Sequence, residues 1–224
     1  MSLMVIDPYR FGSGSGTSIS LSFTDSDSSA TNATEYTFSG LDIGAASATR
    51  VVVVCVSGHD VGGTFLSVSS LTIAGSAATS VVESAAFNTI AAIFRRTVTT
   101  GTTADVVVTF SEAIRGAHVS VYVLDNLASA TPTDTASDNN EHPPSTTIDI
   151  SAGGVAIAVA AQTATGATTT WTNLVEDYDA QTAVDGDVMS SASDAFEAAQ
   201  TGLAITATFS SANSNAAICV ASWL

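Results

Sequence analysis

The feature that most constrains this chain is a long series of short apolar runs, rich in β-branched residues, that continues from residue 17 to residue 224. Gly, Asn, Asp, Ser and Thr separate the runs, and this pattern is typical of β-strands joined by turns. The best helical candidate is the short segment 191–200, SASDAFEAAQ. Strands are expected at 19–23, 35–41, 50–56, 66–73, 79–83, 89–98, 105–110, 117–124, 146–150, 155–161, 169–175, 183–189, 203–209 and 216–223.

The two halves of the chain resemble each other. Residues 51–58, VVVVCVSG, align with residues 155–162, VAIAVAAQ, and residues 111–124 align without a gap with residues 210–223. Two copies are too few for a solenoid, so the alternatives are one pseudo-twofold sandwich or two tandem sandwiches. We expect an all-β, antiparallel, jelly-roll-like β-sandwich built from two pseudo-repeated halves. We favour one compact body, because a merged body buries proportionally more surface.

Composition divides the chain into four segments. Residues 1–16 are an extended N-terminal arm with a Gly/Ser tether, and residues 17–125 are the first β half. Residues 126–146 are a connection rich in Pro, Asp and Asn, and residues 147–224 are the second β half. The connection holds three of the four prolines, so a loop is expected there. Alternating Gly and Ser make a flexible tether, which hinges the arm to the body.

The charge of the chain is strongly one-sided. It carries 21 acidic residues against five arginines, has no lysine, and has a formal net charge of −16. Nucleic acid binding depends on neutralisation of phosphates by Lys and Arg, so nucleic acid is not an expected partner. No apolar run approaches the roughly 20 residues of a spanning helix, so membrane insertion is not expected. The outward strand positions are expected to carry mainly Ser, Thr and Ala.

No pattern in the sequence points to catalysis, and we expect a non-enzymatic protein. His59, His118 and His142 lack the spacing of a zinc site and are interpreted as surface histidines. Cys55 and Cys219 each lie inside an apolar run, which predicts buried thiols that act as small hydrophobic groups. A disulfide between them requires their strands to be neighbours.

The carboxylates are densest in the segment 174–188, LVEDYDAQTAVDGDV. Ca²⁺ takes six to eight hard oxygen ligands, and Asp177, Asp179, Asp185 and Asp187 are the candidates to supply several of them. The spacing differs from that of an EF-hand, and the alternative interpretation is a solvated acidic hairpin. No other metal and no organic cofactor is expected.

The N-terminal peptide IDPYRFG is followed by phrases such as SSLTIAGSAATSVVES, TVTTGTTADVVVTFS and SAGGVAIAVA. In this combination the chain resembles virion proteins of tailed bacteriophages. The resemblance implies a structural subunit on the exterior of the virion, either a head decoration or fibre protein or a tail fibre component. It also implies that the arm attaches the chain to other virion proteins, and an oligomer of this chain is expected as well.

The arm either packs back on its own body or inserts into a groove on another chain. In the second case the residues expected to dock are Ile6, Pro8, Tyr9, Arg10 and Phe11. The proline keeps the peptide extended and lowers the cost of ordering it, and Arg10 would pair with a carboxylate of the partner. The alternative function is a receptor- or glycan-binding module of a phage tail or a cell surface. In that case loops 57–64 and 176–187 would contact a sugar on the host surface.

Overall fold

The computed structural model describes residues 18–60, 62–63, 65–139, 141–164, 167–181, 187–211 and 215–224, with Asp187 described by its backbone alone. These residues form seventeen β-strands and no helix, so the expected all-β fold class is confirmed. No helix in this part of the chain has the length and apolarity needed to cross a membrane. The arm expected at residues 1–16 lies outside the described residues.

Nine strands belong to the first half of the chain and eight to the second. Those of the first half are β1 (Ser20–Ser29), β2 (Ala33–Asp42), β3 (Val51–His59), β4 (Val68–Ile73), β5 (Ser76–Ala77), β6 (Thr79–Ala86), β7 (Thr89–Thr97), β8 (Thr103–Ile114) and β9 (Gly116–Asp125). Those of the second half are β10 (Asp134–Asn139), β11 (Ser145–Ile150), β12 (Gly154–Thr163), β13 (Thr169–Thr172), β14 (Val175–Gln181), β15 (Asp187–Phe196), β16 (Gln200–Phe209) and β17 (Ala216–Trp223).

Each half forms two antiparallel sheets. In the first half the inner sheet has the strand order β1-β9-β3-β7-β6 and the outer sheet the order β2-β8-β4-β5. Strands from the start of this half lie beside strands from its end, as β1 lies beside β9 and β2 beside β8. This is the arrangement of a jelly roll. The second half repeats it, with an inner sheet β10-β17-β12-β15-β14 and an outer sheet β11-β16-β13.

The internal duplication is confirmed by strand order and by register. The inner sheets have the same order once β1, β9, β3, β7 and β6 are replaced by β10, β17, β12, β15 and β14. Cys55 pairs with Ser120 in the first half, and Val159 pairs with Cys219 in the second. These are the positions that the sequence alignment places opposite each other, so the two halves share one frame.

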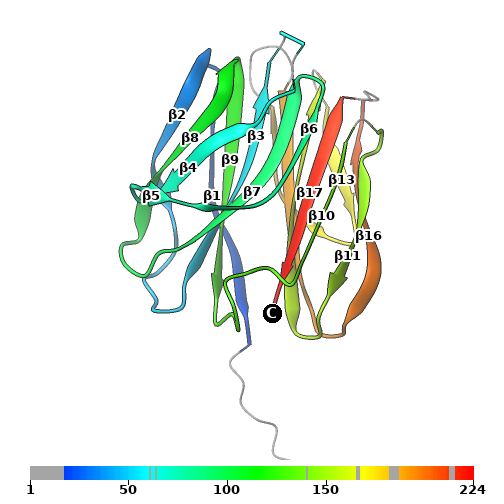
Figure 1. Ribbon diagram of the computed structural model, residues 1–224. Coiled ribbons are helices and arrows are strands. Elements are labelled where there is room, and N and C mark those ends of the chain that lie inside the picture. The colour runs from blue at the N-terminus through cyan, green and yellow to red at the C-terminus, as the bar shows by residue number, and fades with distance from the viewer. Residues whose placement is uncertain are drawn as a thin grey trace, which may run out of the picture.

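Three apolar cores hold the four sheets together in layers (Figure 1). One core, which includes Phe110, lies inside the first half, and another, which includes Phe209, lies inside the second. The third core lies between the two inner sheets and includes Val53, Ile157 and Trp223. The molecule is therefore two sandwiches packed face to face, and the expectation of one merged sandwich is wrong. Each half is large enough to close its own core.

The strands β3 and β12 each contain an unbroken apolar run, residues 51–56 and 155–161, and both faces of each run are buried. In β3, Val52 and Val54 face the core of the first half, whereas Val53 and Cys55 face the core between the halves. Full burial of one valine contributes about 1.5–3 kcal/mol, and all nine residues of β3 are buried. Each of β3 and β12 therefore contributes side chains to two cores, and together the two strands link all three cores.

Two local expectations from the sequence are wrong. Most of the helical candidate 191–200 belongs to β15, which pairs with β12 on one side and β14 on the other. Sheet pairing on both sides overrides the helix propensity of Ala and Glu in this segment. The connection 126–146 also contains more than loop, because Asp134–Asn139 forms β10 and pairs with β17. Strand β10 lies at the edge of its sheet, where alternate residues stay partly exposed.

The outward face of the second outer sheet carries hydroxyl groups, as expected from the sequence. Thr147, Thr170, Thr172 and Thr208 are all exposed on β11, β13 and β16. Short hydroxyl side chains solvate this face and lose little rotamer entropy when another surface covers it.

A single guanidinium joins two loops at one end of the first half. Arg50 is fully buried, and its Nε donates to the carbonyl of Val98 at 2.6 Å. Its two Nη groups donate to five further carbonyls at 2.7–3.0 Å, those of Ile43, Gly44, Ala45, Thr100 and Gly101. Carbonyl dipoles thus solvate the buried charge, and the side chain fixes the β2–β3 loop against the β7–β8 loop.

We expect Arg50→Met to destabilise the protein by about 3 kcal/mol or more, because several buried carbonyls lose their donor at once. In a chain of this size the melting temperature should fall by roughly 6–12 °C, measured by circular dichroism. Arg96→Met is the matched control, since Arg96 makes a single hydrogen bond to the described residues, from Nη1 to the carbonyl of Ile73. Equal losses in the two variants would contradict the role given to Arg50.

Candidate functional site

The body has two distinct ends, set by the register of its strands. Ser20 at the start of β1 lies beside Asp125, whereas Ser29 at the end of β1 lies beside Ala117. Because His59 at the end of β3 pairs with Gly116, the β3–β4 connection lies at the end opposite to Ser20. The chain therefore enters the body at one end, where β17 also finishes, and presents the β3–β4 connection at the other (Figure 1).

An exposed aromatic pair lies at the end opposite to the chain entry. Phe65 and Phe87 are 65% and 42% exposed, and no other phenylalanine among the described residues is so exposed. Their ring centroids are 6.3 Å apart with an edge-on geometry, and an isolated β-bridge joins the two residues. The amide of Gly63 donates to Oδ1 of Asn88 at 2.8 Å, which holds the β3–β4 connection against the β6–β7 turn. Both rings therefore stay exposed at this end of the described chain.

The histidines are not the surface groups that the sequence suggested. His59 is only 3% exposed and His118 is fully buried, so that interpretation is wrong for both. Nδ1 of His118 lies 3.3 Å from the hydroxyl of Tyr178, across the junction of the two halves. His142 lies 3.3 Å from Gln162 and is partly buried. His118 is buried because the second half covers the face of its sheet that carries this side chain. The periodicity of the sequence could not show that another sheet packs there.

A polar cluster crosses the apolar junction of the two halves. The hydroxyl of Tyr122 donates to Oδ2 of Asp177 at 3.1 Å and lies 2.8 Å from Oγ of Ser191, and Ser193 donates to the same Asp177 oxygen at 2.7 Å. Burial raises the pKa of Asp177 above 3.8, and repulsion by Asp194 adds to the increase, while the two hydroxyl donors oppose it. Burial also raises the pKa of Tyr122. The cluster fixes the orientation of the two inner sheets, because its partners come from both halves.

Of the four candidate calcium ligands, the structure describes the side chains of Asp177 and Asp179 and directs them to different partners. Asp177 lies in the cluster between the halves, whereas Asp179 accepts from the amide and hydroxyl of Thr169 on the outer sheet. A register shift between Glu176 and Tyr178 separates the directions of the two carboxylates. Asp185 and the side chain of Asp187 lie outside the described residues. No group of three His, Cys, Asp or Glu side chains within the described part of the chain is placed to hold a metal ion.

The two cysteines are buried free thiols, as predicted. Both face the core between the halves, Cys55 from β3 and Cys219 from β17. The thiol of Cys219 donates to the carbonyl of Ala91 at 3.2 Å. Burial raises the pKa of both thiols, so they act as small hydrophobic groups at the junction.

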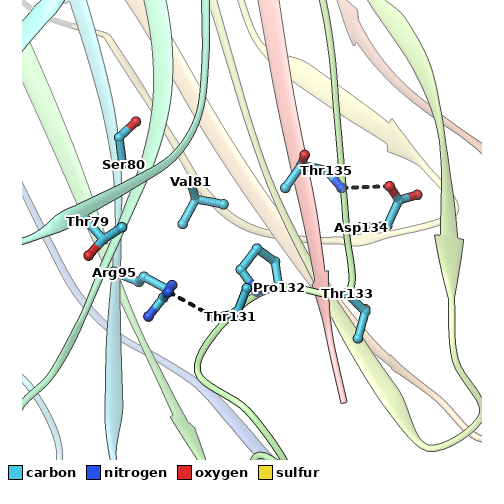
Figure 2. Close-up of a pocket in the computed structure, with 9 residues that line it drawn as sticks. All are labelled: Thr79, Ser80, Val81, Arg95, Thr131, Pro132, Thr133, Asp134 and Thr135. Atoms are coloured by element: carbon cyan, nitrogen blue, oxygen red, sulfur yellow. Dashed lines mark hydrogen bonds between the residues drawn. The ribbon is translucent and has the colours of Figure 1, made fainter.

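A hollow of about 420 Å³ opens where the edges of the two inner sheets meet (Figure 2). Strands β6 and β7 form one wall, and residues 131–135 at the start of β10 form the other. Arg95 points across it and donates from Nη2 to Oγ1 of Thr131 at 3.3 Å. No other hydrogen bond and no ion pair of Arg95 occurs among the described residues.

A second hollow, of about 500 Å³, lies on the opposite side of the junction, between β1 and β14–β15. It is the counterpart of the first under the internal duplication, since β1 corresponds to β10 and β14 to β6. Its lining contains Asp177 and Asp194 but no basic residue. The two hollows therefore occupy equivalent positions, but the first is lined by Arg95 and Asp134, whereas the second is lined by two acids and no base.

The expected docking residues Ile6, Pro8, Tyr9, Arg10 and Phe11 lie outside the described residues. The described chain begins at Ser18, and Ile19 already lines the second hollow. Comparison with known protein families and with curated proteins finds no match to this chain.

Sequence reasoning did not identify Phe65, Phe87 or Arg95 as surface features. Phe65 and Phe87 are each a single aromatic residue beside turn-forming Gly, Thr or Asn, which is a weak signal for a loop tip. Arg95 lies in an apolar strand segment, IAAIFRRT, where only knowledge of the sheet edges could show that its side chain enters a hollow.

We expect the free energy of unfolding to decrease as the pH rises from about 5 to about 8. Burial raises the pKa values of Asp177, Glu83 and Glu176 in the folded state, with further repulsion between carboxylates at Asp177 and Glu176. A group whose pKa is raised by folding stabilises the protein below its unfolded pKa. That contribution is lost as the pH rises through the folded pKa. Denaturant titrations at the two pH values measure the difference.

Two variants separate the contribution of Asp177 to this pH dependence from that of the general charge repulsion in a chain of net charge −16. Asp177→Asn removes the titrating group and should reduce the pH difference. Ser193→Ala removes a donor that lowers the pKa of Asp177, so it should enlarge the difference. A stability that increases with pH, or an unchanged pH difference in Asp177→Asn, would show that this carboxyl does not titrate as described.

Proposed function

We propose that this chain is a non-enzymatic structural subunit on the exterior of a phage particle, attached through its N-terminal arm. The observation that carries the proposal is that the two ends of the body differ. The chain enters at one end of β1, while the exposed pair Phe65 and Phe87 lies at the opposite end. An arm that leaves from the entry end can hold the double sandwich with its far end directed outward.

The composition and packing of the body support the same role. Both faces of the inner sheets are covered, which makes a stiff four-layer unit. The outer face of β11, β13 and β16 carries short hydroxyl side chains that can be covered at small entropic cost. The resemblance of the sequence to virion proteins of tailed bacteriophages agrees with such a unit. The partners are other virion proteins and further copies of this chain.

A second candidate function is receptor or glycan binding. The exposed edge-on pair of Phe65 and Phe87 favours it, because exposed aromatic side chains are frequent anchors of binding surfaces. In this function the loops at the end opposite to the arm would contact the host surface. The two functions are compatible, since a fibre protein can be anchored at one end and bind a receptor at the other.

Deletion of residues 1–11 tests the proposed attachment. We expect the shortened chain to fold normally but to lose binding to virions of the encoding phage prepared without this protein. Binding is measured by co-sedimentation, with the full-length chain as the reference. The double substitution Tyr9→Ala and Phe11→Ala should weaken binding by roughly tenfold or more, as for other aromatic anchors.

An arm of the same composition in scrambled order is the matched control, and it should fail to restore binding to the shortened chain. Circular dichroism and melting temperature confirm that each variant keeps its fold. Undiminished binding of the shortened chain would contradict attachment through the arm, and absence of binding by the full-length chain would contradict a virion role.

A further inference from the structure

Arg95 differs from Arg50 and Arg96 in the hydrogen bonds that its guanidinium makes. The guanidinium of Arg50 donates to six carbonyls and has no capacity left. Arg96 donates from Nη1 to the carbonyl of Ile73 inside the first half. Arg95, in contrast, makes a single neutral hydrogen bond to the described residues, although the chain carries 21 acidic residues. Its Nε is buried and has no hydrogen-bond partner among them. The two Nη groups are therefore the donors that remain available to an anionic group in the hollow.

The internal duplication shows that the fold does not need a cation at this position. Arg95 pairs with Val53 in the first half, and Ser193 pairs with Ile157 at the same place in the second. Ser193 there donates to Asp177, within the hollow that carries acidic groups. Equivalent positions in the two halves thus hold either a serine or an arginine. The fold therefore does not require the charge of Arg95, which is specific to this hollow.

The lining also contains Asp134, whose carboxylate accepts from the amides of Thr135 and Asp149. Most of the remaining lining is suited to a ligand that is rich in hydroxyl groups. Thr79 and Thr135 contribute exposed side-chain hydroxyls, and no side-chain hydrogen bond of theirs to another described residue is present. Hydroxyls both donate and accept, which matches the hydroxyls of a sugar ring. Pro132 and Val81 add small apolar surfaces to the same hollow. Its volume of about 420 Å³ lies within the ordinary range of small-molecule sites.

We propose that the hollow around Arg95 binds an acidic sugar, with the guanidinium of Arg95 holding the carboxylate of a hexuronic acid residue. The surrounding hydroxyls of Thr79 and Thr135 contact the ring hydroxyls. This inference is independent of attachment through the arm, and it gives a ligand class and a location to the glycan-binding alternative.

Titration of the ¹⁵N-labelled full chain with trigalacturonate, followed by NMR, tests the proposal. We expect chemical-shift changes at the amides of β6, β7 and residues 131–135. The fully methyl-esterified trisaccharide, which keeps the sugar skeleton but has no charge, should bind much more weakly. Arg95→Gln should weaken trigalacturonate binding by roughly ten- to a hundredfold, the usual range for loss of a charged hydrogen bond. Arg95→Lys should lie between, since it keeps the charge and loses the fork.

Arg96→Gln is the matched control, because it makes the same change of charge at the neighbouring residue, whose guanidinium bonds elsewhere. It should leave trigalacturonate binding within about threefold of the unaltered chain, the scale of a screened surface charge. Several outcomes would overturn the proposal: no binding of trigalacturonate, equal binding of its methyl ester, or equal losses in Arg95→Gln and Arg96→Gln. Binding of a poly-glutamate peptide at Arg95 without binding of the uronate would also overturn it, in favour of a protein ligand.

Discussion

The face-to-face packing of the two inner sheets is the interaction on which the rest of the structure depends. Each sheet is a wall of one sandwich and, with its other face, a wall of the core between the sandwiches. Val53, Ile157 and Trp223 lie in that shared core, and Tyr122 and Asp177 fix its orientation by a hydrogen bond across it. Without this packing, each half would expose a broad apolar face to water.

This packing also decides where functional surfaces can form. Because the inner faces are covered, the described residues offer partners the outer sheets, the two ends and the lateral junctions. The two junctions carry hollows of equivalent frame, one with Arg95 and the other with Asp177 and Asp194. The two ends differ as well, since the chain enters at one and the pair Phe65 and Phe87 lies at the other. The two halves repeat one strand arrangement, and different residues at equivalent positions, such as Arg95 and Ser193, make their surfaces different.

Local patterns predicted most strands, the duplication and the burial of Cys55 and Cys219. They failed where burial depends on a neighbour distant in the sequence. The acidic segment Asp134–Asn139 has few apolar residues, yet it forms β10 because the edge of β17 offers it hydrogen-bonding partners. The segment 191–200 favours a helix locally but is held as a strand by β12 and β14. His118 was expected at the surface, and the second sandwich covers it.

The same limit explains which site residues the sequence could indicate. A run such as VVVVCV is compatible with a strand buried on one face or on both, so the number of layers did not follow from it. The surface position of Arg95 follows from the contact between two sheet edges, and that of Phe87 from the contact between two turns. Neither contact can be read from the sequence. The clustered acids 177–187 suggested a shared cation, whereas the backbone directs Asp177 and Asp179 to different partners.

Native-state hydrogen exchange, read by mass spectrometry across a denaturant series, tests the central claim most directly. If the inner sheets pack into one unit, the amides of β3, β9, β12 and β17 should exchange only through global unfolding, with one common free energy and one denaturant slope. Exchange of β12 and β17 at a lower free energy than β3 and β9, with a smaller slope, would show that the halves open separately and would contradict the account.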